Sequence, residues 1–547
     1  MTPICRVVAI VALASLVAAA AWAQPQVVES APNEVDVRGP DLDGDGMPDS
    51  WERFFGLDPL VDDGGLDRDD DGVSNRDEFR FRTLPTAVAN AWPYAYAAER
   101  RYAFAEGLVT AQFVTVPTLT SDQPFGPSGH VQVQTFGEGG HRAEYFVTLP
   151  PGGSVDVDAR AILGGWTGAF GFLVSADVPV VVERRMLWGD GGLYGGHTVA
   201  RSACPAWGNC LFAEGATLPG FDTYLLFLNL GNETVDVSVT YLMADGDPIV
   251  CWHRLPARAR TTIRVSDAAS TEPRLRAAEF GVSVKSVADD VWVERSMYYT
   301  PPGGPWFAAG FSQGEASASQ TAYFAEGATG PFFDEFLLLA NPLDEVQQVR
   351  ASFLLEDGRV LEKTYALPPR SRRTIWVNYE EFPGEGRALA HTVHATRLEA
   401  SGLVIAAERT MWWPATPGGA WTGVHNGVGA GQLGGVWPFA SGSGRYGAEA
   451  GDTYYLVANV GAEPTACSIL VADRHGRDLV RQRLALIPPM TRVTFWLEPL
   501  LASLPQPAGF LVFFSSTGLV VERASYTTLG SSWWRRGSAV MGGDPSR

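Results

Sequence analysis

Two acidic stretches near the N-terminus contain the residues whose types and spacing could do chemistry. The first, "DLDGDGMPDSWE", begins at Asp41 and places side-chain oxygens at positions 1, 3, 5, 9 and 12, with glycine at position 6. Carboxylates crowded in this way repel one another unless a cation lies among them. Calcium takes six to eight oxygen ligands and is bound by loops with this spacing, so the stretch predicts a calcium site.

The same order recurs in "DRDDDGVSNRDE", which begins at Asp67, and it is the ligand order of an EF-hand loop. We therefore expect two Ca²⁺ sites. The expected ligands are Asp41, Asp43, Asp45, the Met47 carbonyl, Asp49 and Glu52 in the first loop, and Asp67, Asp69, Asp71, the Val73 carbonyl, Asn75 and Glu78 in the second. The alternative, a solvated acidic linker, does not require glycine at the sixth position and glutamate at the twelfth of both copies.

The two loops, with "GLDPL" between them, resemble the bacterial thrombospondin type 3-like calcium-binding repeats and, more loosely, the paired loops of dockerins. The resemblance covers about residues 36–86 and implies a small calcium-binding module. Short helical segments are expected after each loop, in "SWERFF" and "RDEFRFR". Such segments are too short to be stable without tertiary contacts.

The first residues, "MTPICRVVAIVALASLVAAAAWAQ", have a positive residue, an apolar run and a small-residue cleavage site after Ala23. This is the pattern of a secretory signal peptide, so we expect a secreted protein, periplasmic or extracellular, either free or associated with the cell surface. No later apolar run is long enough for a membrane span. The net charge of −20 argues against nucleic acid as a partner.

Cysteine use is compatible with an oxidising compartment. Cys204 and Cys210 bracket the turn-like "PAWGN" and could form a disulfide, whereas Cys251 and Cys467 lie in apolar runs and are expected to be free thiols. No Cys-x-x-Cys metal motif is present.

The rest of the chain is a repeat with two markers. The first marker is "FAEG" at Phe104, "LFAEGAT" at Leu211, "YFAEGAT" at Tyr323 and a degenerate "YGAEAG" at Tyr446. The second marker is "VERRMLW", "VERSMYY", "AERTMWW" and "VERASY". Both recur about every 110 residues, which is long enough for each unit to form its own core.

Each unit reads as short, turn-separated strands with little helical periodicity, as in "FDTYLLFLNLGNETVDVSVTYLM". The fold class expected is therefore all-β, with tandem immunoglobulin-like β-sandwiches after a small calcium-binding loop module. The expected division is 1–23 signal peptide, 24–36 linker, 37–86 paired calcium loops, 87–100 linker, 101–204 a divergent first sandwich, 205–318 the second, 319–440 the third and 441–547 the fourth.

These units resemble an immunoglobulin-like repeat of bacterial secreted proteins with the pattern "YFAEG…VERxMYW", a family of uncharacterised function. The marker glutamates and arginines are expected to be structural, with Glu214–Arg295 and Glu326–Arg409 as candidate pairs, because a buried charge needs a partner. The alternative partners of each arginine are nearby backbone carbonyls.

We expect no catalytic site. "GFSQG" around Ser312 matches a nucleophile motif that requires a strand-to-helix turn, and "GAGQLG" from Gly429 lacks the strand and helix of a dinucleotide-binding unit. His391 and His394 are three residues apart on a strand-like run, which places them on opposite faces.

Two functions remain open at this point. The first is an exported calcium-binding structural or adhesive protein, in which the sandwiches form a non-catalytic array whose partner is an unknown extracellular protein or glycan. The second is a secreted glycan-binding protein that uses Trp188, Tyr299, Trp412 and Trp413 as stacking platforms. Because neighbouring residues of a strand face opposite sides, Trp412 and Trp413 cannot both enter one core; we expect the outward ring to be covered by the glycine- and proline-rich tail that follows.

Overall fold

The structure is a computed structural model that describes residues 40–49, 52–53, 57–68, 74–76, 79 and 101–541. Gaps in the last range fall at 122–127, 190–194, 200–202, 207–208, 289, 301–307, 313–318, 403–404, 415–420, 432, 441–449, 474, 476–477, 485, 498, 501–509 and 529–535. The expected signal peptide and both expected linkers lie outside the described residues.

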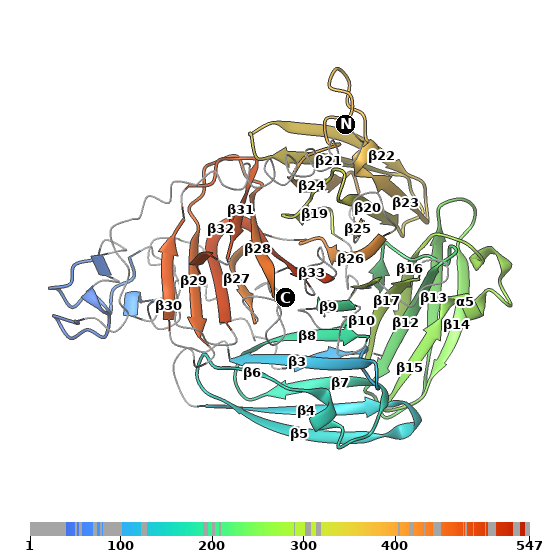
Figure 1. The fold of residues 1–547 in the computed structure, drawn as a ribbon, viewed down its shortest axis with the longest axis horizontal. Helices are drawn as coiled ribbons and strands as arrows, with labels where there is room; N and C mark the ends of the chain where they lie inside the picture. The colour runs from blue at the N-terminus through green and yellow to red at the C-terminus, as the bar shows by residue number, and fades with distance from the viewer. Residues whose placement is uncertain are drawn as a thin grey trace, which may run out of the picture.

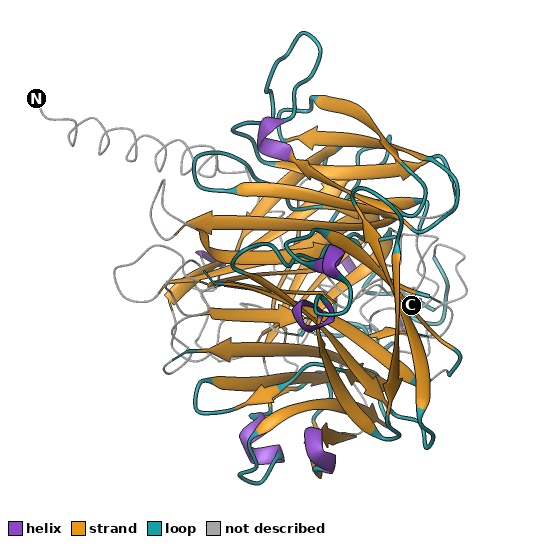
Figure 2. Ribbon diagram, turned by 90° about the vertical axis from the view of Figure 1, so that its right-hand side faces the viewer, coloured by secondary structure: helices purple, strands orange, loops and turns teal. Residues whose placement is uncertain are grey.

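The chain is all-β and forms tandem β-sandwiches, as the alternating strand patterns predict. Figure 2 shows that strands dominate and that helices are reduced to single turns. The short helical turns are α4 (Ala159–Ile162), α5 (Val265–Ala268), η1 (Glu138–Gly140), η3 (Pro273–Leu275) and η4 (Val377–Tyr379).

Sandwich 1 has one sheet in the order β1-β7-β4-β5, with β2 beside β7, and a second in the order β6-β3-β8-β9. Its strands are β1 (Arg101–Phe104), β2 (Leu108–Val109), β3 (Phe113–Ser121), β4 (Gly129–Gly137), β5 (Arg142–Leu149), β6 (Ser154–Asp156), β7 (Gly168–Ala176), β8 (Val180–Trp188) and β9 (Gly195–Val199).

Sandwich 2 packs the sheet β10-β17-β12-β15, extended by β18 on β17, against β11-β16-β13-β14. Its strands are β10 (Cys204–Pro205), β11 (Cys210–Phe212), β12 (Phe221–Asn229), β13 (Val235–Met243), β14 (Ile249–Leu255), β15 (Ala259–Arg264), β16 (Phe280–Ser286), β17 (Val291–Tyr299) and β18 (Ala308–Ser312). A disulfide joins Cys204 to Cys210 and so ties β10 of one sheet to β11 of the other.

Sandwich 3 repeats the arrangement, with the sheets β23-β20-β25-β26 and β19-β24-β21-β22. Its strands are β19 (Thr321–Phe324), β20 (Asp334–Asn341), β21 (Gln347–Leu355), β22 (Val360–Leu367), β23 (Ser371–Trp376), β24 (His394–Ala400), β25 (Ala406–Pro414) and β26 (Trp421–Val428).

In sandwich 4 the long strand β32 (Phe510–Thr528) belongs to both layers. Its first half pairs with β27 and β29, and its second half pairs with β28 and β33; Gly518, with a φ of 82°, lies between the two halves. Glycine suits this position because other residues rarely adopt a positive φ. The remaining strands are β27 (Gly434–Phe439), β28 (Ala450–Asn459), β29 (Ser468–Asp473), β30 (Asp478–Arg483), β31 (Thr491–Trp496) and β33 (Arg536–Met541).

The four sandwiches close into a ring around a common centre (Figure 1). Each unit ends in a hairpin formed by its "ER" strand and a following strand: β8–β9, β17–β18, β25–β26 and β32–β33. The last strands of these hairpins contact one another in a cycle, β9 with β18, β18 with β26, β26 with β33, and β33 with β9. Sandwich 4 therefore packs against sandwich 1, although these two units are farthest apart in the sequence.

Candidate metal centre and ring interfaces

The first acidic loop is wound as a cation-binding loop would be. Carboxylate oxygens of Asp41, Asp43 and Asp45 lie within 4.8 Å of one another. The backbone turns at Gly46, whose φ is 90°, and Gly44 N and Gly46 N donate to the two oxygens of Asp41 at 2.8 and 3.0 Å. The chain thus directs several carboxylates toward one point.

A second group of carboxylates adds a residue that the sequence reasoning missed. Asp45, Glu52 and Asp63 also have oxygens within 4.8 Å of one another. Asp63 lies between the two loops and outside either twelve-residue pattern, so loop spacing alone could not identify it. The structure places it beside Asp45 and Glu52 by folding the connecting segment back.

Several oxygens in this part of the chain are buried and have no hydrogen-bond partner. They are Asp43 Oδ2, Asp45 Oδ2, both Glu52 carboxylate oxygens, Asp63 Oδ1 and Asn75 Oδ1. Burial, followed by repulsion from Asp43 and the neighbouring aspartates, raises the pKa of Glu52 to about 8. Buried anionic oxygens without donors are costly unless a cation coordinates them, so this donor set fits Ca²⁺.

The described residues 74–76 of the second loop contact the first loop and the segment between the loops. Asn75, from the second loop, donates its side-chain amide to the Asp63 carbonyl at 2.9 Å, and Arg76 Nε donates to the Asp45 carbonyl. Arg76 N also donates to the Gly64 carbonyl at 2.9 Å. The second loop therefore supports the residues that form the acidic groups of the first.

The remaining expected ligands differ in their placement. Asp49 directs its carboxylate to protein groups, because Oδ1 accepts from Leu42 N at 2.9 Å and Oδ2 from Arg53 Nη2 at 3.1 Å. Met47 is fully buried and follows Asp45, whose Oδ1 accepts from the Met47 N–H. Asp67 is described but belongs to neither acidic group, while Asp69, Asp71, Val73 and Glu78 lie outside the described residues.

The "ER" markers build the interfaces of the ring. Each glutamate pairs with the arginine of the preceding sandwich, and the last arginine pairs with the first glutamate. The pairs are Arg184–Glu294 at 2.5 Å, Arg295–Glu408 at 2.9 Å, Arg409–Glu522 at 2.8 Å and Arg523–Glu183 at 3.0 Å, with every side chain at most 2% exposed. Because consecutive strand residues face opposite sides, one "ER" dipeptide can present its acid to one neighbour and its base to the other.

The two pairs expected from the sequence are confirmed. Arg295 lies 3.1 Å from Glu214, and Arg409 lies 2.7 Å from Glu326. The alternative partners are used as well, since both arginines donate to the backbone carbonyl of the same glutamate. Glu106 pairs across an interface instead, with Arg260 of sandwich 2 at 2.7 Å.

The fourth copy of the "FAEG" marker is not the one the sequence suggested. In sandwich 4 its place is taken by "PFASG", which contains Phe439 and Ala440. Ala440 N donates to Glu183 at 3.0 Å, as Ala213 N of the sandwich 2 marker does to Glu408 at 2.9 Å. The copy expected at Tyr446 and Glu449 lies outside the described residues, and in the sequence a serine follows Ala440 where the other copies have the marker glutamate.

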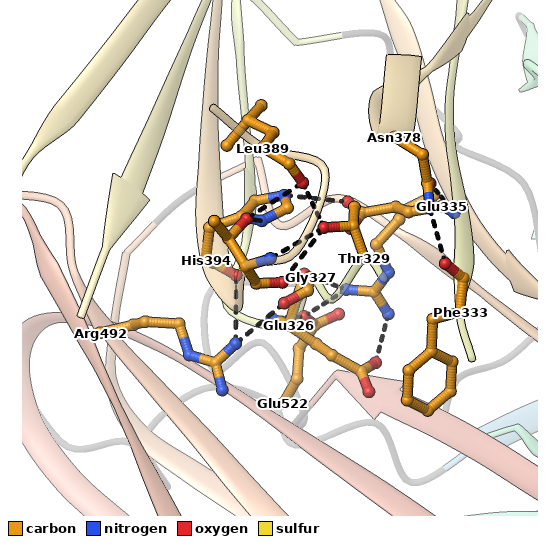
Figure 3. Close-up of polar contacts among 12 residues, drawn as sticks. Glu326, Gly327, Thr329, Phe333, Glu335, Asn378, Leu389, His394, Arg492 and Glu522 are labelled. Carbon is orange, nitrogen blue, oxygen red and sulfur yellow. Dashed lines mark hydrogen bonds and ion pairs between the residues drawn. The ribbon is translucent and has the colours of Figure 1, made fainter. Parts of the chain in front are cut away.

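Sandwich 3 contains a buried pair that sequence reasoning also missed. His394 Nε2 lies 3.3 Å from Glu335 Oε1, and both side chains are fully buried. The corresponding positions in sandwich 2 are Phe280, which packs on Gly215 of that unit's marker, and Thr223, whose hydroxyl bonds to the Ala216 backbone. Arg492 of sandwich 4 donates to the carbonyl of His394, so the pair adjoins the interface between sandwiches 3 and 4 (Figure 3).

The tryptophans proposed as stacking platforms lie inside the junctions. Trp188, Trp412 and Trp413 are 3%, 3% and 0% exposed, and Tyr299 is half-buried. Trp412 and Trp413 do face different neighbours: Trp412 packs against Tyr299 of sandwich 2 and the tail residue Trp421, while Trp413 packs against Tyr526 of sandwich 4. Trp188, Trp412 and Trp413 are thus covered, by neighbouring sandwiches and by Trp421, and give no support to glycan stacking. Residues 301–307 and 415–420 of the tails that were expected to cover them lie outside the described residues.

Comparisons with known proteins give no identity. No family model and no curated protein matches the chain. A solved structure of Thermotoga maritima 1070 is similar to 21% of this chain over 96% of its own length, with 14% identity and a TM-score of 0.18. The Anabaena sensory rhodopsin transducer matches 17% of this chain over 99% of its own, with 24% identity and a TM-score of 0.15.

A tetra-tandem repeat from the extending region of a large adhesion protein covers 80% of this chain and 97% of its own, with 11% identity and a TM-score of 0.10. At these TM-scores the likenesses carry no argument about function. Within the part of the chain that the structure describes, none of the helices has the length and apolar character needed to cross a membrane.

Proposed function

We propose that this protein is an exported, calcium-binding structural protein. In this proposal the calcium loop module, residues 37–86 and here called the head, is loaded with calcium and attached to a closed ring of four β-sandwiches. The observation that carries the proposal is the convergence of Asp41, Asp43, Asp45, Glu52 and Asp63, whose oxygens gather in two overlapping groups. Several of these oxygens are buried without donors, which is the condition that a bound dication relieves.

The ring supports a structural role. Its interfaces consist of buried ion pairs and aromatic side chains, which fix the sandwiches relative to one another. The marker glutamates and arginines are therefore occupied in holding the ring together. An adhesive role, with an extracellular protein or glycan as partner, is part of the same proposal.

Calcium binding is tested on the full mature chain by isothermal titration calorimetry after removal of metal with a chelator. We expect calcium uptake with release of protons, because buried carboxylates must be ionised to coordinate the ion. Replacing Glu52 with Gln or Asp63 with Asn is expected to lower the affinity at least about tenfold, since each removes an anionic ligand.

Asp245→Ala is the matched control, because Asp245 is an exposed acid in sandwich 2, remote in the sequence from the head. It should leave the titration unchanged. The absence of any calcium uptake at millimolar concentration would overturn the proposal. An effect of Glu52→Gln without an effect of Asp63→Asn would restrict the site to the first loop.

A further inference from the structure

A row of aromatic rings crosses the junction between sandwiches 2 and 3 and ends on the surface. Successive ring centroids lie 6.3 Å apart for Tyr299–Trp421, 5.9 Å for Trp421–Phe336, 5.2 Å for Phe336–Trp376 and 4.4 Å for Trp376–Tyr379. The inner members are half-buried, whereas Trp376 is 38% and Tyr379 50% exposed. We call these five residues the aromatic row.

The sandwich fold does not require the outer rings of the row. Trp376 stands opposite Phe336 in the β20–β23 register, and the matching position of sandwich 2, opposite Tyr224, is Arg264. Arg264 bonds to Asp222 at the start of β12, as Trp376 bonds to Asp334 at the start of β20. The constant feature is thus a donor to this aspartate, and an aromatic donor is not needed for the fold.

The tryptophan recurs in sandwich 4, where Trp496 is 46% exposed and donates to Asp452, whereas Tyr379 has no aromatic counterpart in sandwich 2. Three residues after Arg264 the second sandwich has Asp267, a strongly exposed acid, where the third has Tyr379 in the turn η4. An exposed aromatic pair in one repeat, at positions where another repeat is charged, indicates a role other than stability.

The outer rings are held in place by polar contacts. Asp334 accepts from both indoles, from Trp376 Nε1 at 3.1 Å and from Trp421 Nε1 at 2.8 Å. The Arg387 guanidinium lies 4.7 Å from the centre of the Tyr379 ring, and Arg387 also lies 3.7 Å from Glu381. The rings are therefore pre-oriented, which reduces the entropy lost when a ligand binds.

We propose that the aromatic row binds a neutral oligosaccharide or polysaccharide. A sugar ring presents an apolar C–H face that packs on an aromatic ring, and its hydroxyls can donate to Asp334, which is half-buried beside the row. The cations nearest the row are already engaged, because Arg387 pairs with Glu381 and Lys363 with Glu380. With a chain net charge of −20, an acidic polysaccharide would be repelled, so the charge balance favours a neutral ligand.

This proposal does not depend on the proposed calcium function, because the row lies in the ring and contains none of the head's acids. It also differs from stacking on Trp188, Trp412 and Trp413, which are covered. Of the four platforms expected from the sequence, only Tyr299 belongs to the row, as its half-buried inner end. A neutral sugar should accordingly bind with equal affinity in calcium and in chelator.

The test is affinity electrophoresis and retention of the full chain on neutral polysaccharides (cellulose, xylan, chitin and β-1,3-glucan), with polygalacturonate as the acidic comparison. We expect retention on at least one neutral polysaccharide and none on polygalacturonate. Trp376→Ala and Tyr379→Ala should each weaken binding about tenfold or more, and Trp376→Phe should retain most of it, because the ring face is preserved.

Trp252→Ala is the matched control, since Trp252 is 70% exposed on β14 of sandwich 2 and lies outside the row. It should bind like the unaltered protein, and the melting temperatures of all variants should agree within a few degrees. The proposal is overturned if no neutral polysaccharide is retained, if Trp376→Ala binds normally, or if Trp252→Ala loses as much binding. Retention of apolar peptides in place of sugars, lost in Trp376→Ala, would also overturn it and assign the row to protein docking.

Discussion

The contact between Glu183 and Arg523 closes the ring, and its removal should open the molecule at one place. Arg523 donates through both terminal nitrogens to the two oxygens of Glu183, each at 3.0 Å, and both side chains are fully buried. Ala440 N donates to the same carboxylate at 3.0 Å. Glu183→Gln keeps the shape of the side chain but leaves the arginine buried without a counter-charge.

The expected cost follows from this burial. Removing one partner of a buried ion pair destabilises the structure that contains it by about 3–5 kcal/mol. A cost of this size raises the population of the open form at least about 100-fold, because each 1.4 kcal/mol is a factor of about ten. No short connection holds sandwich 1 next to sandwich 4, so the loss appears as separation of the two units.

Hydrogen exchange followed by mass spectrometry measures this opening, and small-angle scattering reports the radius of gyration. We expect faster exchange in β8, β9 and β33 of Glu183→Gln, together with a larger radius of gyration. Glu294→Gln is the matched control: it breaks the equivalent pair with Arg184, but sandwiches 1 and 2 follow one another directly in the chain. This variant should lower stability without a comparable increase in radius.

Two results would refute the reasoning. Unchanged exchange in Glu183→Gln would mean that the pair contributes nothing net to closure. An equal increase of the radius in Glu294→Gln would mean that chain connectivity does not distinguish the interfaces.

Three further predictions concern single sites of the ring. Burial raises the pKa of Glu326, but His425, Arg409 and the Tyr526 hydroxyl together outweigh it and lower that pKa to about 2. The contribution of Glu326 to stability is therefore complete above about pH 4.5 and should be lost as the pH falls toward 2. Thermal melts across this range measure the loss, and Glu326→Gln, which does not titrate, shows how much of it comes from other carboxylates. His394→Phe alone should destabilise sandwich 3 by about 3 kcal/mol, because it leaves the Glu335 carboxylate buried and unpaired. Adding Glu335→Thr should restore most of this stability. Urea unfolding measures both variants, and a double variant no more stable than the single one would contradict the prediction. Cys204→Ser should lower the stability of sandwich 2 by about 2 kcal/mol, as measured by urea unfolding, while Cys467→Ser serves as a control for the loss of a thiol that is not bridged.

The acidic groups of the first loop were recognisable from the local spacing of their carboxylates. Carboxylates on alternate positions with glycine at the sixth are sufficient to predict the loop, and Asp41, Asp43, Asp45 and Glu52 do lie in the two acidic groups. Asp63 could not be predicted, because it reaches the group through the path of the connecting segment rather than through a spacing.

The all-β fold and its period were also accessible from the sequence. Strand alternation, turn residues and the repeated markers depend on local chemistry, and they identified the structural role of Glu214, Arg295, Glu326 and Arg409. The opposite orientation of Trp412 and Trp413 followed from strand geometry as well, since adjacent side chains must face opposite sides.

What the sequence by itself determined is therefore the local chemistry: the acidic first loop, the strands, the repeat and the need of each buried charge for a partner. Only the tertiary structure decided which partner each charge has. Glu183 pairs with Arg523 because the four sandwiches are arranged in a ring. The free energy of ring closure depends on packing across four interfaces, and residues far apart in the chain contribute to each of them. The aromatic row has the same origin, since Tyr299 and Trp421 meet only where two sandwiches touch.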